Sequence, residues 1–367
     1  NGMGVENNSI KNVLICPLDW GMGHAARLIP IIKKIQNKGH RVFIACTKNP
    51  QHFFQNELSN YVWIPCACPT IQYSDKKLSV FDLLKLIPVI FVGIKKDKRD
   101  IEGWIKKYNI QLVISDNRYG CHSPNAYSVL ITHQVKIELP KKLKWAEKML
   151  HQRIKKLIYK FNRCWIPDIN EMPNFAGDLS MQFSLNGKSA FIGLLSRFEE
   201  NSLAATPSDK QYEVIAIASG PEPQRSIFAK MLLRQMKDLH KPCILVLGDF
   251  SKPFSTWHEE NVLVYSSMNT HQLYQAIQSA KYIVARSGYS TIMDLISLKR
   301  TAILVPTPGQ TEQEYLANYY KSRRMFVIAE QQHFNLSESL AELSVYSWMY
   351  FYKANENFEI ELERVLN

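Results

Sequence analysis

YIVARSGYSTIMD, residues 282–294, joins a short apolar strand to the first turns of a helix. The first NH groups of such a helix lack intrahelical partners and lie at the positive end of the helix dipole. Ser287 and Gly288 are small enough to let an anion approach, so the stretch predicts a seat for a diphosphate. Asp294 follows in the helix, and its carboxylate suits ribose hydroxyls. The alternative is a plain turn in which Gly288 needs a positive φ and a Ser or Thr side chain caps the helix.

Residues 301–305 form the next expected strand, and the loop PTPGQTEQEYLA (306–317) then opens another helix. Open α/β sheets bind their ligands at the carboxyl ends of the strands, where this loop lies. Glu312 and Gln313 can accept and donate hydrogen bonds, which suits sugar hydroxyls. The alternative is that these two residues, following Thr311, only start the helix.

The segments RSGYSTIMDLISLKRTAILVP (286–306) and PGQTEQEYLA (308–317) resemble the donor-binding domain of GT-B glycosyltransferases, most closely family 28, which includes the peptidoglycan transferase MurG. The resemblance implies a diphosphate at the Ser-Gly turn, a ribose at the acidic residue of the helix and a donor sugar at the Glu-Gln pair. The family often closes the last motif with Asn-Ala, whereas this chain has Leu316-Ala317. The resemblance therefore does not identify the donor sugar. With the neighbouring polar residues, the implied donor site comprises Arg286, Ser287, Gly288, Ser290, Thr291, Asp294, Gln310, Glu312 and Gln313.

The N-terminal half has a glycine loop of its own, PLDWGMGHAAR (17–27), which follows the expected strand 13–16. Gly21 and Gly23 allow a ligand to approach the backbone closely. The third glycine of the dinucleotide fingerprint is missing, which disfavours a Rossmann oxidoreductase. The string Gly-x-Gly-His-x-x-Arg resembles the first loop of family 28 and family 1 transferases, although it lacks the fuller glycine set of MurG.

His24 is the predicted catalytic base, because a histidine near neutral pH can take the proton of an acceptor hydroxyl. Asp116 ends another expected buried strand, 112–115, and both strand ends would open on one sheet edge. Contact between the two is therefore plausible, and family 1 transferases use a His-Asp dyad in similar places. Alternatively, His24 caps its helix or touches phosphate while Asp116 caps a loop. Asp19 and His133 are competing candidates for the base or the acceptor site.

A second loop of the C-terminal half, SGPEPQR (219–225), corresponds to the glycine-rich loop that faces the donor phosphates in the resembling family. Ser219, Gly220 and Arg225 are included in the predicted donor site, where Arg225 would add positive charge. The prolines depart from the glycine-rich form, and a simple surface turn is equally compatible with them.

Strands alternate with helical patterns along the 367 residues, of which 46% are hydrophobic. This rhythm predicts α/β architecture: two Rossmann-like domains of the GT-B type, with parallel sheets and a cleft between them. The further expected strands are 42–46 and 129–132, then 213–218, 243–247 and 262–265. A Gly-, Ser- and Asn-rich stretch, 175–209, interrupts the rhythm. We therefore expect an acceptor-binding domain at 1–195, a nucleotide-sugar-binding domain at 196–345, and a C-terminal helix at 346–367 that packs back on the first domain.

A net charge of +12 and a pI near 9.2 indicate acidic partners, and we expect no nucleic acid among them. Residues 141–163 predict a basic amphipathic helix, which either rests on an anionic membrane or packs as an ordinary helix with a solvated basic face. Seven scattered cysteines without C-x-x-C spacing, and no visible secretory signal, indicate a cytoplasmic protein without disulfides or zinc.

We therefore expect a hexosyltransferase that moves a sugar from a nucleotide diphosphate donor to an unidentified acceptor. A lipid-linked molecule is one candidate for the acceptor. UDP as the nucleotide rests on the resemblance alone. Inversion at the anomeric carbon and independence of metal are expected too, since no Asp-x-Asp element is present and a helix N-terminus can stabilise the leaving group. No cofactor is expected. The alternatives are a nucleotide-sugar hydrolase or epimerase on the same fold, and a non-catalytic subunit that binds nucleotide sugar.

Overall fold

The computed structural model describes residues 10–19, 21–67, 80–135, 145, 147–181, 187–198, 211–347 and 357–367, and it describes all their side chains except those of 80–90 and 181. Some predictions concern residues outside this part. They are Trp20 of the first loop, Cys68 among the cysteines, most of 136–146 in the basic segment, and residues 199–210 near the expected domain boundary.

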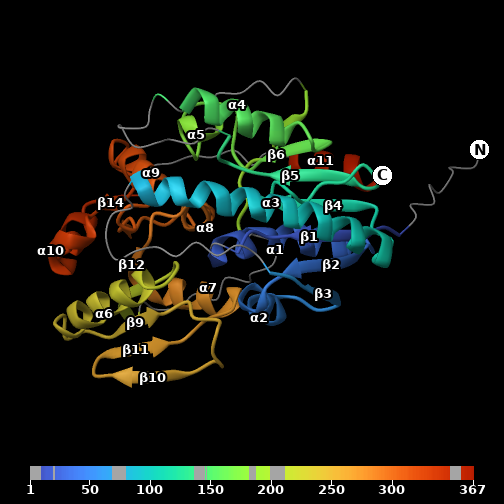
Figure 1. Ribbon diagram of the computed structural model, residues 1–367. Coiled ribbons are helices and arrows are strands. Elements are labelled where there is room, and N and C mark those ends of the chain that lie inside the picture. Colours follow the sequence, from blue (N-terminus) through green and yellow to red (C-terminus); the bar gives the residue numbers. More distant parts are fainter. Residues whose placement is uncertain are drawn as a thin grey trace, which may run out of the picture.

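Two seven-stranded sheets organise the described residues (Figure 1). The first sheet has the order β3-β2-β1-β4-β5-β6-β7 and is parallel throughout. Its strands are β1 Asn12–Cys16, β2 Arg41–Cys46, β3 Tyr61–Pro65, β4 Leu112–Asp116, β5 Tyr127–Ile131, β6 Arg163–Ile166 and β7 Ser189–Phe191.

The second sheet has the order β10-β11-β9-β8-β12-β13-β14. Its strands are β8 Tyr212–Ile217, β9 Cys243–Val246, β10 Thr256–Glu259, β11 Val262–Tyr265, β12 Ala280–Ala285, β13 Ile303–Leu304 and β14 Val327–Ile328. The predicted pair of parallel α/β sheets is confirmed, with one exception: β10 runs antiparallel to β11 at the edge.

The sequence reading missed β3, β6, β7, β10 and β14. β3, β7, β10 and β14 are the edge strands of the two sheets, where few residues are fully buried and the apolar pattern is weak, and β6 has only four residues. The strand expected at 301–305 is also shorter than expected, since only Ile303–Leu304 are in β13.

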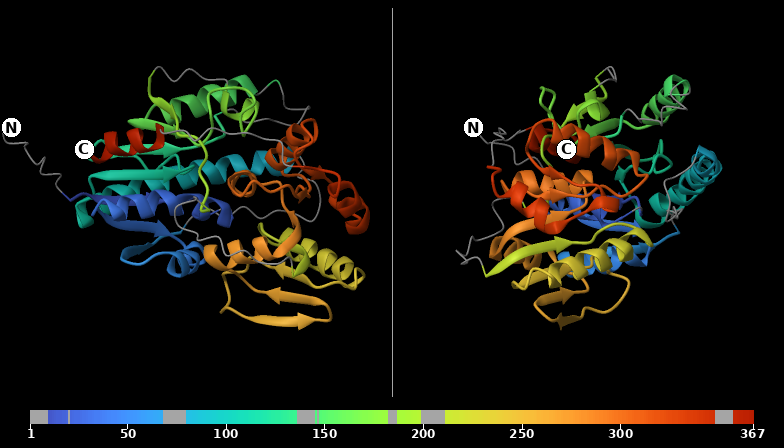
Figure 2. Two further views of the ribbon diagram at one scale, coloured as in Figure 1. Left: turned by 180° about the vertical axis from the view of Figure 1, so that it is seen from behind. Right: turned by 90° about the vertical axis from the view of Figure 1, so that its left-hand side faces the viewer.

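Helices cover both faces of each sheet (Figure 2). They are α1 Met22–Asn37, α2 Lys48–Glu57, α3 Val80–Tyr108, α4 Glu147–Ile158, α5 Asp178–Met181, α6 Gln224–Lys237, α7 Thr270–Ser279, α8 Tyr289–Ser297, α9 Thr311–Lys321, the 3-10 turn η3 Gln331–His333, α10 Leu336–Leu343 and α11 Asn357–Leu366. Each sheet has an apolar core on both faces: in the first half, Val13 and Ile15 of β1 pack with α1 on one face and Leu14 and Cys16 face the other, and the second half is built in the same way.

The C-terminal helix α11 lies beside the first sheet (Figures 1 and 2). Phe358 and Leu362 join the same core cluster as Val13 and Ile15 of β1. The Glu361 carboxylate accepts hydrogen bonds from Arg163 at 2.6 and 2.7 Å. Residues 348–356 of the expected final helical stretch lie outside the described residues, and the predicted domain limits stay a prediction.

Candidate functional site

Each sheet reverses its strand order at one point, and the two reversals place the predicted loops. In the first sheet, β1 pairs with β4, so the loops after these strands leave from neighbouring positions. In the second sheet, β8 pairs with β12 in the same way. A crevice forms outside the carboxyl ends of the strands at such a switch point. A cavity of about 500 Å³ is lined by segments from both switch points. They are the loop after β1 and the start of α1 in the first half, and the loop after β8 and the start of α8 in the second half.

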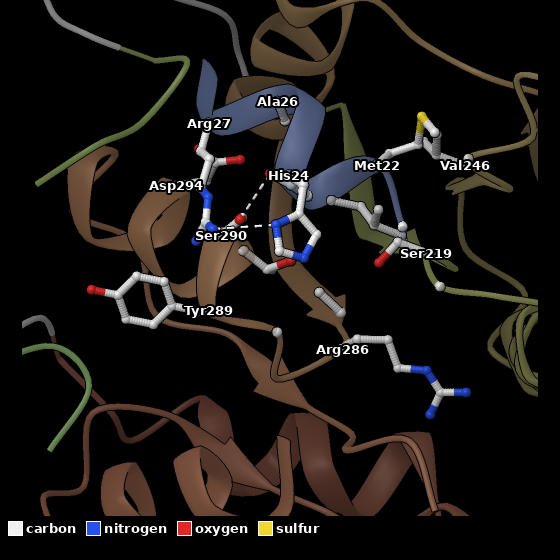
Figure 3. A pocket seen from close by; sticks show the side chains of 18 of the residues that line it. Met22, His24, Ala26, Arg27, Ser219, Val246, Arg286, Tyr289, Ser290 and Asp294 are labelled. Atoms are coloured by element: carbon white, nitrogen blue, oxygen red, sulfur yellow. Dashed lines mark hydrogen bonds between the residues drawn. The ribbon is translucent and has the colours of Figure 1, made fainter. Parts of the chain in front are cut away.

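His24 reaches this cavity from the first turn of α1 (Figure 3). Its Nδ1 lies 3.2 Å from Oδ1 of Asp116, which is fully buried at the end of β4, and also 3.2 Å from NH2 of Arg27. Among the described residues, its Nε2 has no hydrogen-bond partner. His24 lies inside α1, whose N-cap residue is Gly21, so the alternative in which His24 caps the helix is wrong. Whether this pair acts in catalysis stays a prediction.

Arg27, which the sequence reading quoted but gave no role, is the main partner of Asp116. Its Nε donates to Oδ2 of Asp116 at 2.6 Å, and its NH2 donates to Oδ1. Burial alone would raise the pKa of Asp116, but the Arg27 charge and His24 hold it well below its usual range. The available signal was the spacing: His24 and Arg27 are three positions apart, and therefore share a helix face.

His133 follows β5 and lies against both Arg27 and the second half of the chain. NH1 of Arg27 lies 2.9 Å from His133 Nδ1, and His133 Nε2 lies 2.8 Å from Oε1 of Glu312. Arginine can only donate and a carboxylate can only accept, so we assign the proton to Nε2 and the lone pair to Nδ1. The Tyr289 ring stacks on the imidazole at 3.9 Å between centroids. Burial lowers the pKa of His133, and its lone pair is occupied.

Glu312 is thereby held by the first half of the chain. Besides His133, its carboxylate accepts a hydrogen bond from the Gln134 side chain. Burial would raise the pKa of Glu312, but His133, and further His24 and Arg27, lower it. The structure thus brings His24, Asp116, His133 and Glu312 into one connected cluster through Arg27.

The start of α8 is open toward the cavity. Gly288, its N-cap residue, has φ −70° and ψ 147°, so the alternative that it needs a positive φ is wrong. No side chain within the described part of the chain caps this helix, which also removes the expected Ser or Thr cap. Ser290 and Thr291 line the cavity, and Ser290 Oγ donates to the Gly23 carbonyl at 2.9 Å. The first turn of α8 and the glycine loop of α1 are therefore in direct contact.

Two residues of the predicted donor site have side chains that are already engaged. Ser287 Oγ donates to the Gln313 carbonyl at 2.9 Å, and Gln313 Oε1 accepts from the Thr307 amide at 2.9 Å. Both are buried and hold the loop after β13 against the loop after β12. Gln310 lines the cavity, and its buried Oε1 has no partner within the described residues.

Asp294 lines the cavity but also binds the segment that precedes the second half. Its carboxylate accepts from Ser196 Oγ at 2.6 Å and from Arg197 Nε at 3.1 Å. Burial raises the pKa of Asp294, although Arg197 and Ser196 act in the opposite direction.

The two arginines of the predicted donor site differ in their partners. Arg286 is buried over the Phe228 ring and donates to the carbonyls of Gln224, Val305 and Pro306. No carboxylate of the described residues contacts it, and burial lowers its pKa to about 9. Arg225 instead pairs with Glu222 at 2.7 Å and Asp249 at 3.4 Å, so its charge is largely balanced.

The remaining predicted residues line the cavity without forming a cluster. They are Asp19, Gly21, Ser219 and Gly220. The Asp19 carboxylate accepts a hydrogen bond from Thr47, and both glycines have positive φ angles, 137° and 120°.

Within the described residues, no three His, Cys, Asp or Glu side chains are grouped as metal ligands. No helix of that part has both the length and the apolar content to cross a bilayer. The six described cysteines are free thiols.

Comparisons with known proteins agree with this architecture. Residues 248–356 match the glycosyltransferase family 28 C-terminal domain. The glycotransferase of kitacinnamycin superposes with a TM-score of 0.62 at 12% identity, covering 98% of this chain and 94% of that chain. The calicheamicin glycosyltransferase CalG4 gives 0.58 at 12% identity (97% and 93%). SnogD from Streptomyces nogalater gives 0.55 at 11% identity (98% and 95%).

No curated protein matches the chain in sequence. At such low identities the structural likeness establishes the fold alone, and the predicted GT-B fold is confirmed by it.

Proposed function

We propose, from the premise that this chain is a GT-B protein with a family 28 C-terminal domain, that it transfers a sugar from a nucleotide diphosphate to an acceptor hydroxyl. One observation carries the proposal: a single cavity contains both the uncapped N-terminus of α8 and the imidazole of His24. An anion seat and a general base are the two parts that such a transfer requires.

The donor would bind to the second half of the chain. We place its diphosphate at the first turn of α8, where NH groups and the helix dipole favour an anion and the unbalanced charge of Arg286 lies nearby. The ribose hydroxyls would donate hydrogen bonds to the Asp294 carboxylate. They would replace part of the hydrogen bonding that this carboxylate now receives from Ser196 and Arg197. Glu312 would face the sugar, a hexose, and UDP is the nucleotide that the family resemblance favours.

The acceptor would enter from the first half, beside His24. His24 Nδ1 lies 3.2 Å from both Asp116 Oδ1 and Arg27 NH2, and the mechanism requires that it carries the ring proton and donates to Asp116 rather than accepting from Arg27. The Nε2 lone pair is then free for the acceptor. Nε2 takes the hydroxyl proton, the oxygen bonds to the anomeric carbon, and the bond from that carbon to the diphosphate breaks, its electron pair leaving with the nucleotide. Attack opposite the leaving group inverts the anomeric carbon. The α8 N-terminus and Arg286 supply the positive charge that stabilises the leaving group, so this proposal calls on no metal ion.

We also propose that α4 rests on an anionic membrane surface, which would suit a lipid-linked acceptor. Trp145 is 77% exposed and Met149 53% exposed, next to the exposed Lys148, Arg153 and Lys156. Ile154 and Ile158 of the same segment are buried instead. The exposed apolar and basic residues thus share the face away from the core, a pattern typical of interfacial helices.

The test begins with calorimetric titration of UDP, GDP, dTDP and CMP into the wild type, Asp294→Asn and a control, Asp100→Asn, on α3 outside the cavity. We expect one nucleotide to bind saturably, and Asp294→Asn alone to weaken it. If no nucleotide binds, the donor site is refuted.

Turnover then separates the alternatives. Nucleotide release that requires an added acceptor supports the transferase, and His24→Asn should reduce it by about 10²- to 10⁴-fold without changing nucleotide affinity. Release without acceptor would indicate a hydrolase, a changed sugar without release an epimerase, and binding without either a non-catalytic subunit.

A further inference from the structure

Arg27 connects the two ends of the cavity cluster. Its side chain is buried, with only 3% exposed, and it makes contacts in two directions. On one side, Nε and NH2 bind the two oxygens of Asp116. On the other, NH1 donates to His133, whose opposite nitrogen donates to Glu312. The hydrogen-bonded path therefore runs from Asp116, beside His24, to Glu312 on α9.

The planar guanidinium is suited to this position. Its five donors diverge in fixed directions, so one group can bind a carboxylate through two atoms and still donate elsewhere. A lysine ammonium in the same place is a point charge on a flexible stem, and it could satisfy Asp116 or His133 but not both in this geometry.

His133 transmits the contact across the interface. Both its ring nitrogens are engaged, and the Tyr289 ring, from the second half, covers its face at an interplanar angle of 3°. Its orientation is thus set by Arg27 and Asp116 from the first half and by Tyr289 and Glu312 from the second. A shift of either half would break at least one of these contacts.

We propose that Arg27 is a positioning residue, which holds the base His24 directly and through Asp116, and the sugar-facing Glu312 through His133, in a fixed relation when the two halves are closed. This inference rests on the proposed function. Catalytic groups displaced by about 1 Å can lose about 10²-fold in rate, so the arrangement would matter for turnover more than for binding.

The experiment compares wild type with Arg27→Lys and Arg27→Gln, using Arg41→Lys, at an exposed position of β2, as the matched control. We expect kcat to fall by about 10²-fold in Arg27→Lys and at least as far in Arg27→Gln, while nucleotide Kd changes by less than about 2-fold. Nitrogen-15 NMR of the histidine rings should show His133 as one tautomer, Nε2–H, in the wild type and the control. In both Arg27 variants the Nδ1 resonance should shift, because its lone pair loses the donor NH1, while Glu312 keeps the proton on Nε2.

Wild-type kcat in Arg27→Lys, or an unchanged Nδ1 resonance of His133 in both Arg27 variants, would overturn the proposal. If the Arg27 variants fail to fold, His133→Asn and His133→Gln replace them. Asn retains an acceptor near the position of Nδ1, and Gln retains a donor near the position of Nε2. If the path needs both contacts, kcat falls in each variant. A wild-type kcat in either variant refutes the proposal. The NMR measurement on His133 needs no turnover. A failure of the transferase proposal can therefore be told apart from a failure of the Arg27 proposal.

Discussion

Gly288 lies at a position where the backbone does not require a glycine. Its φ of −70° and ψ of 147° are open to any residue. A Cβ there would meet Gln313 Nε2 at 3.8 Å and Thr291 Oγ1 at 4.0 Å, which is ordinary contact. The absent side chain therefore leaves the first NH groups of α8 uncovered, and we ascribe the glycine to ligand approach.

Gly288→Ser should have opposite effects on stability and on binding. A serine hydroxyl can cap the free NH groups of α8, so we expect the free energy of unfolding to rise by a few tenths of a kcal/mol. The same hydroxyl competes with the diphosphate, so nucleotide affinity should fall about 10-fold, or about 1.4 kcal/mol. Urea unfolding and calorimetry measure the two effects.

Gly288→Ala is the matched control for this substitution. Its methyl group adds bulk but no cap, and alanine is a poor N-cap residue, so stability should drop rather than rise. Nucleotide affinity in Gly288→Ser equal to that of the wild type would show that the diphosphate lies elsewhere.

At the scale of elements, α4 illustrates a helix whose two faces have different surroundings. The apolar residues of this segment do not share one environment, since Trp145 and Met149 are exposed whereas Ile154 and Ile158 are buried. Of the two alternatives for residues 141–163, an ordinary packed helix accounts for Ile154 and Ile158 but not for the exposure of Trp145 and Met149, because the underlying core ends near Leu150.

Charge reversal on this face should reduce membrane binding. We expect the double variant Lys148→Glu, Lys156→Glu to lose about 2 kcal/mol, or about 30-fold, in partition to vesicles containing phosphatidylserine, since each lysine near an anionic surface contributes about 1 kcal/mol. Vesicle co-sedimentation at low salt is the measurement. The double variant Lys230→Glu, Lys321→Glu carries the same charge change on the second half and should bind like the wild type. Equal loss in both pairs would contradict a specific role of α4.

At the scale of the whole molecule, residues of both halves meet around the cavity. Phe250, from the loop after β9, packs edge-on against Phe53 of α2 with 5.3 Å between ring centroids. Glu57, at the end of α2, accepts from the amide and hydroxyl of Thr270 at the start of α7, where the helix dipole favours a carboxylate. These contacts join the two halves at further places besides the contact of His133 with Glu312.

Mild acid should destabilise this arrangement. Burial lowers the pKa of His133, and burial together with the charges of Lys98 and Lys160 lowers that of His122 to about 4. A histidine whose pKa is lower folded than unfolded binds fewer protons in the folded state. Its stability contribution is therefore complete above the unfolded value, near 6.5, and is lost as the pH falls toward the folded value.

We expect the free energy of unfolding to fall between pH 7 and pH 5, by at most about 1.4 kcal/mol per pH unit for each such histidine. Urea unfolding at several pH values measures the slope. His122→Asn and His133→Asn should each flatten it, whatever their effect on stability at pH 7. A curve that is level over this range, or a slope unaffected by both substitutions, would contradict the assignment.

Local patterns were sufficient for much of the fold and for the residues that line the cavity. The strand-loop-helix units at 13–35 and 282–297, and the apolar strands of both sheet centres, were predicted because each depends on residues close together in the chain. The edge strands were missed because their stability comes from pairing with a neighbour rather than from their own pattern.

What the sequence by itself determined was the α/β class, the two sheets and the list of loops at the cavity, since alternation, glycine turns and helix starts are short-range properties. Only the tertiary structure decided which of those side chains meet. Arg27 and Asp116 are 89 positions apart, and His133 and Glu312 are 179 apart. The pairing of Arg27 with Asp116 depends on the strand order that sets β1 beside β4, and the pairing of His133 with Glu312 depends on the packing of the two halves. The burial that makes such polar pairs necessary arises only in the folded chain.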